Sequence, residues 1–373
     1  MTSFFYLIIF DYFYKFDIIY KEVEMKILHT ADIHLGAKNS RIPIDKQSII
    51  KSENLMMIQN LFDMAYKDDY DVVLICGDLF HTKNVTQKVK NNFFDNVKNF
   101  SRPVIYIKGN HDENFEFENI PNNFIVLNEM KPYIEINGVI FWTILQKDIL
   151  FRVFDKSKKN ILLLHGDIEN STDNDFVNIK DINQIPFDYV AMGHIHQFKQ
   201  YNFNNVPYIY SGSLLSNGFD ECGEKGFVEI NIDEEKTNYK FIPFSKRCYR
   251  ICESDITNIN SQKEIIDKIK NDLENQGCKS CDLIKLILTG YFEENTDKNI
   301  NLILDSFQSK YFYIEIEDKS KLKINLEDYK NEKLSFKAEF INLVENKSDL
   351  DEKQKSKICQ IGIEALKGED LSI

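Results

Sequence analysis

The N-terminal stretch of the chain lacks the features that would place it in or across a membrane. Residues 1–20 are rich in Phe, Tyr and Ile, but charged residues interrupt the stretch too often for it to span a bilayer. A basic segment and a small-residue cleavage site, the marks of a signal peptide, are also missing. Because Met25 directly precedes the first apolar strand, we expect translation to begin there. Residues 1–24 would then be a wrongly assigned start or, alternatively, an amphipathic extension.

An excess of positive charge and a regular cysteine framework are missing as well. The formal net charge of −13 argues against general electrostatic adhesion to nucleic acid, although bound metal ions can still present positive charge to phosphate. The seven cysteines form an odd set without the framework of a small secreted domain, so we expect a cytoplasmic protein. A zinc site at Cys248, Cys252, Cys278 and Cys281 is the less favoured interpretation, because the first pair lies in a strand-like stretch.

Histidine is scarce, and its placement is uneven. Five of the seven histidines follow the end of an apolar run: His34, His111, His165, His194 and His196. Continuous apolar runs of this length suit strands buried on both faces. Each run ends in side chains that bind metals, as in Gly109-Asn-His-Asp112, which follows the run 103–107. We expect the two remaining histidines, His29 and His81, to be structural.

The side chains at these strand ends divide into two sets of metal ligands. Asp78 has two carboxylate oxygens and is expected to bridge a pair of cations about 3.5–4 Å apart, the separation used in phosphoester displacement. The expected ligands of one cation are Asp32, His34 and His196, and those of the other are Asn110, His165 and His194. Mixed oxygen and nitrogen ligands suit manganese, iron or zinc better than calcium. The sequence therefore predicts a two-metal site that binds phosphate.

His111 is expected to serve as an acid, although it follows the ligand Asn110. An imidazole can protonate a leaving alkoxide because its ordinary pKa lies near neutrality. Asp112 is expected to orient that imidazole or to stabilise its charge, as carboxylates beside histidines do.

The order of the predicted elements indicates an α/β fold with a second, smaller domain. Helical spacing of apolar residues over 48–67 and 85–100, between apolar runs, is typical of a layered α/β sheet. Short strands then predict a second sheet, which includes 124–127, 133–136, 139–143, 206–210, 226–232 and 238–244. The later part of the chain predicts a compact β-α-β-α-β unit from 248–252, 262–275, 282–289, 299–308 and 311–316.

The last segment, 333–366, predicts two helices with apolar stripes. The stripes are Phe336, Phe340 and Leu343 on the first helix, and Ile358, Ile361 and Leu366 on the second. Amphipathic helices without a core of their own need a partner, so we expect an arm that docks on another protein. The alternative is that the two helices fold back on the preceding domain.

Taken in order, the motifs resemble the calcineurin-like metallophosphoesterases. The matching segments are Asp32-Ile-His34, Gly77-Asp78, Gly109-Asn-His-Asp112, His165-Gly-Asp167 and Gly193-His-Ile-His196. The resemblance implies a two-sheet α/β sandwich flanked by helices, with a dinuclear metal site. More narrowly, His29-Thr-Ala-Asp-Ile-His-Leu-Gly36 and the glycine-containing segment 211–226 look like the SbcD-like DNA repair nucleases, especially the YhaO-like branch. The resemblance is strong over residues 25–245. Over the rest of the chain it extends only to the order of the predicted elements.

The resemblance also implies an activity and partners. It implies a manganese-dependent DNA exonuclease and endonuclease of DNA repair and recombination, working with a coiled-coil ATPase of the SbcC or YhaN kind, and a homodimer. The expected domains are a nuclease domain at 25–245, a smaller α+β DNA-capping domain at 246–325 and a C-terminal helical arm for ATPase docking at 326–373. His81 is a departure, because such proteins often carry Asp there.

Two other functions remain open on the sequence alone. A small-molecule phosphodiesterase or phosphatase would share the ligands, but the Asp-Arg-Gly sequence of protein phosphatases is absent, because Leu79 follows Asp78. A non-catalytic scaffold of the ATPase would be expected to have lost ligands, and none is missing.

Overall fold

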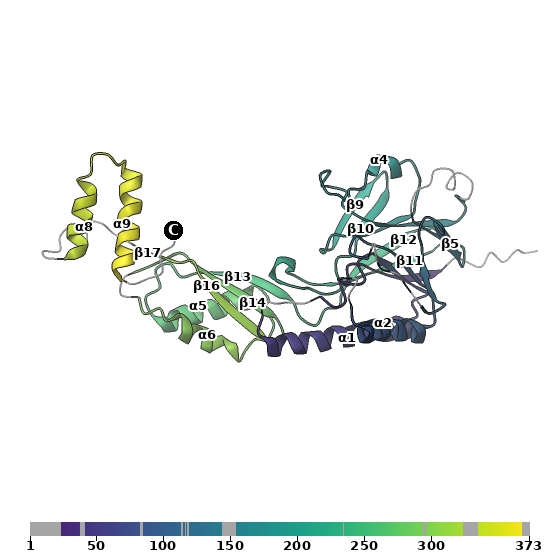
Figure 1. The fold of residues 1–373 in the computed structure, drawn as a ribbon, viewed down its shortest axis with the longest axis horizontal. Helices are drawn as coiled ribbons and strands as arrows, with labels where there is room; N and C mark the ends of the chain where they lie inside the picture. Colours follow the sequence, from purple (N-terminus) through teal and green to yellow (C-terminus); the bar gives the residue numbers. More distant parts are fainter. Residues whose placement is uncertain are drawn as a thin grey trace, which may run out of the picture. The chain divides into compact units, whose positions relative to one another are not determined.

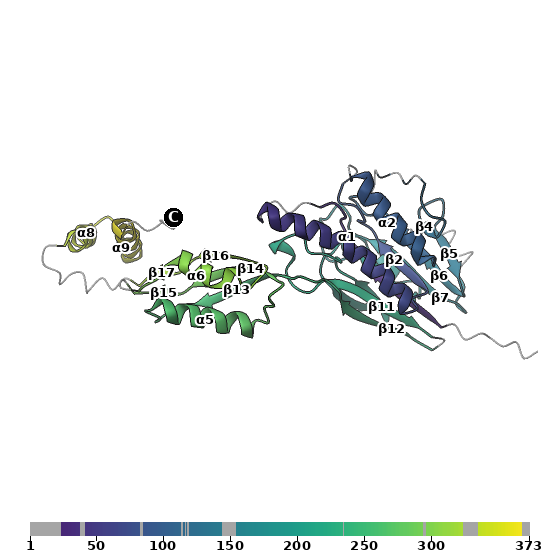
Figure 2. The same cartoon turned by 90° about the horizontal axis from the view of Figure 1, so that it is seen from below.

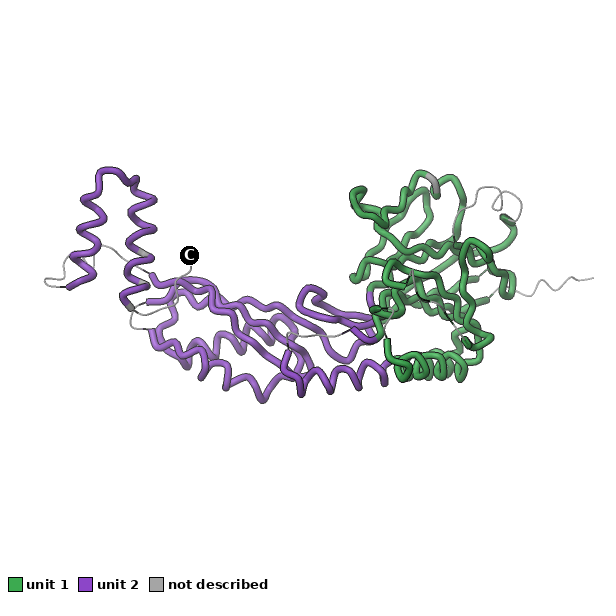
Figure 3. Tube along the Cα trace, viewed as in Figure 1, with its two compact units in different colours: residues 1–35, 58–212, 227–242 green, residues 36–57, 213–226, 243–373 purple. Residues whose placement is uncertain are grey.

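The computed structural model of the chain describes residues 24–37, 42–82, 85–112, 115, 117, 119–143, 154–233, 235–293, 296–323 and 335–367. The expected N-terminal extension, apart from Glu24, lies outside these residues. The described residues form two compact units: those within 1–35, 58–212 and 227–242 make up the first, and those within 36–57, 213–226 and 243–373 the second (Figure 3). The boundaries expected at 245/246 and 325/326 remain predictions.

The first unit contains a six-stranded sheet with α-helices on its outer face. Its strands, in order, are β12 (Thr237–Pro243), β11 (Gly226–Ile232), β1 (Met25–Thr30), β2 (Val72–Cys76), β3 (Val104–Ile107) and β4 (Phe124–Val126). The helix α2 (Gln87–Phe100) and residues 58–67 of α1 (Ile44–Lys67) lie along this sheet (Figure 2). The apolar positions that predicted α1, such as Ile58 and Leu61, are buried. Parallel pairing of β1 with β2 and of β2 with β3 requires crossovers of this kind.

A second six-stranded sheet faces the first (Figure 1). Its strands, in order, are β5 (Tyr133–Ile136), β6 (Val139–Trp142), β7 (Lys159–His165), β8 (Tyr189–Gly193), β10 (Val206–Tyr210) and β9 (Lys199–Phe203). Ile27 and Leu74 of the first sheet and Ile161 and Ala191 of the second belong to one fully buried apolar cluster. The expected two-sheet α/β sandwich is therefore confirmed.

The assignment of strands to sheets was wrong for three of the predicted strands. β4, β11 and β12 belong to the first sheet, whereas we expected them in the second. β11 pairs antiparallel with β1, with Ile230 opposite Ile27, and β4 pairs parallel with β3. An apolar pattern reports how deeply a strand is buried, but it does not specify the neighbouring strand.

The second unit contains a three-stranded parallel sheet with the helices α5 (Gln262–Asn275) and α6 (Ile300–Gln308) between its strands. Its elements are β13 (Tyr249–Asp255), α5, β14 (Leu283–Thr289), α6 and β16 (Tyr313–Asp318), with the short pair β15 (Tyr291–Phe292) and β17 (Lys321–Leu322). The order matches the predicted β-α-β-α-β unit. Ser261 and Asn299 cap α5 and α6 by accepting the backbone N–H groups of Glu264 and Leu302, which explains where the helices begin.

The cysteines of this unit do not assemble into a metal site in the described part of the chain. Sγ of Cys252 lies 3.3 Å from Sγ of Cys278, but no cysteine joins any group of three candidate metal ligands among the described residues. The unfavoured zinc interpretation therefore gains no support.

The two helices predicted in the last segment are α8 (Phe336–Glu345) and α9 (Glu352–Lys367), and they form a helical hairpin. Ile341 of α8 and Ile363 of α9 are buried, whereas Phe336 and Leu343 are 85% and 63% exposed. The apolar stripe that we expected on α8 is therefore largely open to solvent. Among the described residues, none of the helices is long and apolar enough to cross a membrane.

Candidate metal centre

The predicted ligands meet where the strands of the two sheets end. Asp32 and His34 follow β1, Asp78 follows β2, and Asn110 follows β3. In the second sheet, His165 ends β7, and His194 and His196 follow β8. Because parallel strands present their carboxyl ends at the same edge of a sheet, side chains far apart in the sequence come together. The contacts described below link all seven residues.

Asp78 occupies the position expected of a bridging carboxylate. Its Oδ2 lies 3.5 Å from Nε2 of His34 and 3.6 Å from Nε2 of His165, which belong to different predicted shells. Its Oδ1 accepts the backbone N–H of His111 at 2.9 Å. One oxygen therefore anchors the side chain, while the other faces both sets of ligands.

Pairs of ligands within each predicted shell also lie close together. Nε2 of His34 lies 3.1 Å from Nε2 of His196, and Oδ1 of Asn110 lies 3.0 Å from Nε2 of His165. Asp32 is fully buried, and its Oδ1 lies 3.9 Å from Nδ1 of His165. A cation between these buried carboxylates and ring nitrogens would offset the cost of burying the charged groups.

The backbone of the site is strained at the ligands themselves. Asp32, His34, Asp78 and His194 all have positive φ angles, of 50°, 48°, 52° and 95°. Non-glycine residues rarely adopt this conformation, and they keep it only when the surrounding structure enforces it. Such strain is typical of functional sites, because it aims side chains where a relaxed strand end would not.

Two glycines permit the close approach of the strand ends. A Cβ atom at Gly109 would collide with the Asp78 carboxylate, and one at Gly77 would collide with the His165 ring. Gly77 also has a φ of +86°, which L side chains rarely adopt. These glycines therefore belong to the site, although they supply no ligand.

Two of the histidine rings, those of His34 and His165, are held in the form that binds metals. Burial lowers the pKa of His34 to about 2 and the pKa of His165 to about 4, so both rings are neutral at physiological pH. Nδ1 of His165 lies 2.9 Å from the carbonyl oxygen of Cys76. Because a carbonyl oxygen can only accept a hydrogen bond, Nδ1 carries the proton of the neutral ring. Nε2 of His165 then carries the lone pair and faces Asp78 and Asn110. A neutral imidazole with a fixed tautomer is the usual metal ligand.

The residues present fit divalent cations. Asp32, His34 and His196 form one group whose ligand atoms all lie within 4.8 Å of one another, and Asp32, Asp78 and His165 form a second. The second group differs from the expected one, because His194 instead groups with Asp173 and Asp175. Burial raises the pKa of Asp78, and a bound cation would offset this desolvation of the carboxylate.

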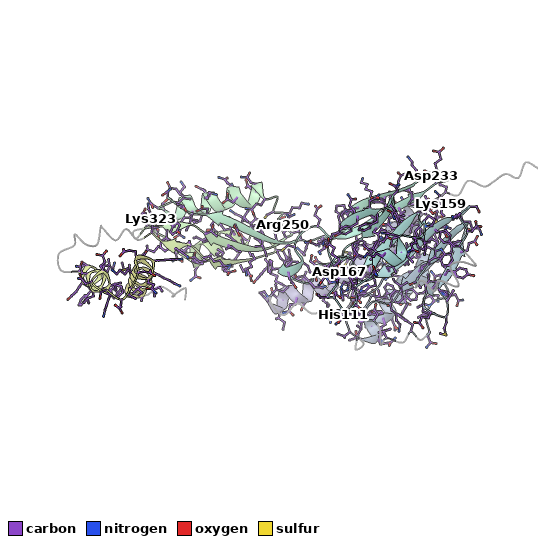
Figure 4. All side chains as sticks on the ribbon, turned by 90° about the horizontal axis from the view of Figure 1, so that it is seen from above. His111, Lys159, Asp167, Asp233, Arg250 and Lys323 are labelled. Atoms are coloured by element: carbon purple, nitrogen blue, oxygen red, sulfur yellow. The ribbon has the colours of Figure 1, made fainter. Side chains whose placement is uncertain are left out.

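His111, which is labelled in Figure 4, lies beside the ligand His34, and its side chain is exposed. Its ring centroid is 4.8 Å from that of His34, and its Nδ1 is 3.2 Å from the carbonyl oxygen of His81. The ring of His81 stacks on it at 5.7 Å. We expected His81 to be structural, but its ring belongs to this group of imidazoles. The sequence signal for this position was that His81 follows Asp78 by three residues.

The structure gives Asp112 different partners from the expected one. The carboxylate is fully buried and accepts the backbone N–H groups of Leu79 and Phe80 at 2.8 and 3.0 Å and the hydroxyl of Tyr106 at 2.6 Å. These contacts hold the segment that follows Asp78. The geometry therefore favours support of this segment over orientation of the His111 ring.

His29 is the structural histidine that we expected. It is fully buried, with Nδ1 3.0 Å from the hydroxyl of Tyr189. Burial lowers the pKa of His29 to about 3.

The strand-end carboxylates, amide and imidazoles of a two-sheet α/β sandwich define a metal-dependent phosphoesterase. Residues 25–198 match the calcineurin-like phosphoesterase family, and this part of the chain is a calcineurin-like metallophosphoesterase domain.

Two relatives and one solved structure are similar to the chain over more than half of its length. The chain is 28% identical over 297 residues to the SbcD component of nuclease SbcCD from Staphylococcus epidermidis, and the match covers 66% of this chain and 77% of the relative. It is 22% identical over 297 residues to the uncharacterized metallophosphoesterase YhaO of Bacillus subtilis, covering 72% of each. The crystal structure of TT1561 of Thermus thermophilus covers 58% of this chain and 98% of that chain, with 13% identity and a TM-score of 0.39.

Proposed function

We propose that the chain is a DNA nuclease that hydrolyses phosphodiester bonds with two divalent cations, of which manganese is the expected one. The observation that carries the proposal is the Asp78 carboxylate, whose Oδ2 lies within 3.6 Å of a ring nitrogen of each predicted shell. The similarity to the SbcD component of nuclease SbcCD supports DNA as the substrate. The mixed carboxylate, amide and imidazole ligands support manganese over calcium.

The proposed roles of the residues follow from their positions. Asp32, His34 and His196 would hold one cation, Asn110, His165 and His194 the other, and Asp78 both. When bound, such a pair supplies charge stabilisation to the phosphate and activates water. His111 presents an exposed imidazole next to His34, and we assign to it the protonation of the leaving oxygen.

A comparison of two substrates tests this function. We expect the full-length protein to degrade linear duplex DNA when manganese is added and to be inactive after chelation. Asp78→Ala, purified identically, controls for contaminating nucleases. Hydrolysis of bis(p-nitrophenyl) phosphate without any cleavage of DNA would refute the proposal in favour of a small-molecule phosphodiesterase. A protein that binds both cations but hydrolyses neither substrate would instead be a scaffold.

We further propose that the C-terminal hairpin docks on a coiled-coil ATPase of the SbcC or YhaN kind. Phe336 and Leu343 on α8 and Leu366 on α9 are all more than half exposed, at 85%, 63% and 53%. Anchors spaced along one side of a helix suit a coiled-coil surface. The same proposal includes three further points. Residues 246–325 would cap the DNA, the protein would form a homodimer, and it would act in the cytoplasm.

Removal of the hairpin tests the docking. We expect a chain truncated after Tyr329 to keep metal-dependent cleavage of short single-stranded DNA, but to lose co-purification with the ATPase and ATP-stimulated degradation of duplex DNA. Full recovery of the ATPase with the truncated chain, or insolubility of that chain, would show that the hairpin is structural.

A further inference from the structure

The ring of His194 is held from two sides. On the ring side, its Nε2 lies 3.5 Å from Oδ2 of Asp173. On the backbone side, its N–H donates to both carboxylate oxygens of Asp32, each at 3.0 Å, while its φ angle is 95°. The strained backbone of His194 is therefore hydrogen-bonded to the predicted ligand Asp32. Its ring contacts Asp173, a residue outside the motifs of the site.

Asp173 owes its position to a folded loop between β7 and α4 (Ile179–Ile182). The two ends of the loop pair with each other, because the N–H of Val177 donates to the carbonyl of Asp167 at 2.8 Å. Within the loop, Oδ1 of Asp173 accepts the backbone N–H of Asp175 at 2.8 Å. One oxygen of Asp173 therefore fixes the carboxylate to the loop, and the other points to His194.

The contact between Asp173 and His194 decides which ring nitrogen of His194 can bind a metal ion. If Nε2–H donates to the carboxylate, the lone pair of the neutral ring is on Nδ1. His165 shows the opposite arrangement, because its Nδ1 faces the Cys76 carbonyl and its Nε2 faces Asp78. The two histidines assigned to one cation would thus bind it through different nitrogens, and each has its own partner to enforce this.

We propose that Asp173 is a positioning residue that orients His194 for the second cation by accepting its Nε2–H. The inference rests on the proposed two-metal function and deepens it. Carboxylates that hold a ligating histidine in this way typically change metal affinity by about 10–100-fold when they are removed.

A separate cation held by the loop is the competing explanation. The ligand atoms of Asp173, Asp175 and His194 lie within 4.8 Å of one another, so they are a candidate group by distance. That explanation predicts three bound cations, whereas a positioning role predicts two.

Metal titration of the full-length protein tests the inference without reference to DNA cleavage. The metal-free protein is titrated with Mn²⁺ by calorimetry, and the visible spectrum of the Co²⁺-loaded protein reports the ligand geometry. We expect two equivalents for the wild type. Asp173→Asn should weaken one equivalent by about 10–100-fold, leave the other within about threefold, and alter the Co²⁺ spectrum.

Asp175→Asn is the matched control, because it removes the same charge from the same loop without removing the partner of the ring. It should leave both affinities within about threefold. His194→Ala provides a second test, since Asp173→Asn should have no further effect on metal affinity in that background. This double variant keeps the inference testable even if the loop rearranges.

Several results would overturn the inference. They are unchanged metal affinities and an unchanged Co²⁺ spectrum in Asp173→Asn, an equal loss in Asp175→Asn, a further loss in the His194→Ala background, or a third equivalent in the wild type. A wild type that binds two cations but never cleaves DNA would refute the proposed nuclease function and leave the role of Asp173 standing.

Discussion

Replacement of Asp112 by alanine separates a structural role of this carboxylate from a role in proton transfer. The substitution leaves three donors without their acceptor: the backbone N–H groups of Leu79 and Phe80 and the hydroxyl of Tyr106. All three residues are buried. The segment that these bonds hold begins at Asp78, so the variant should affect the metal site through the backbone.

The expected loss of stability can be worked out from these contacts. Each unsatisfied buried donor costs about 1–3 kcal/mol, so three of them cost about 3–9 kcal/mol together. Part of this is offset, because burial raises the pKa of Asp112 and the desolvated carboxyl is removed with the substitution. We therefore expect a net loss of about 2–5 kcal/mol for Asp112→Ala. Tyr106→Phe removes one bond to the same carboxylate and should cost only about 1–3 kcal/mol.

Urea denaturation followed by tryptophan fluorescence measures this loss. The chain contains one tryptophan, Trp142, which is buried in the second sheet of the first unit, so its signal reports the unit that contains Asp112. With an m value of about 2 kcal/mol per molar urea, the midpoint of Asp112→Ala should fall by roughly 1–2.5 M. A wild-type midpoint combined with a large loss of turnover would refute this reasoning and return Asp112 to the role of orienting His111.

Three further predictions concern the metals, the acid and the effect of pH. Asp78→Ala should lose both cations, because its carboxylate faces both shells, and elemental analysis that finds unchanged metal content would contradict the assignment. His111→Ala should keep both cations and DNA affinity while single-turnover cleavage falls about 10²-fold or more; loss of metal from the same sample would make His111 a ligand. Burial lowers the pKa of His29 from 6.5 to about 3, so between these values the unfolded chain binds a proton that the folded chain does not. Stability should therefore fall as the pH falls from 6.5 towards 3, with His29 contributing up to about 1.4 kcal/mol per pH unit. His29→Gln should flatten the dependence of the urea midpoint on pH, and an unchanged slope would count against this explanation.

The candidate site could be predicted because parallel strands impose one geometry on many local sequences. Each ligand follows an apolar run, and runs of this kind form parallel strands whose carboxyl ends share an edge. Residues as distant as His34 and His196 could therefore be grouped without knowledge of any contact. The helices were also predictable, since the apolar spacing over α1 and α2 is local.

The remaining features depend on partners that the local sequence does not specify. β11 has the same apolar character as β10, but it pairs with β1 of the other sheet. The Asp112 carboxylate lies next to His111 in sequence, yet its backbone donors come from Leu79 and Phe80. Hydrogen bonds of this kind form between segments brought together by burial of both sheets, so only the tertiary structure determines them.

The same reason explains why the contact of Asp173 with His194 could not be predicted from the sequence. Its loop carries several acidic residues, and nothing in their spacing distinguishes the one that faces His194. The sequence by itself determined which residue types stand at the strand ends and hence the chemistry of the site. The tertiary structure decided which nitrogen of His165 is available and which buried groups hold the ligands in place, because these depend on distances between segments far apart in the chain.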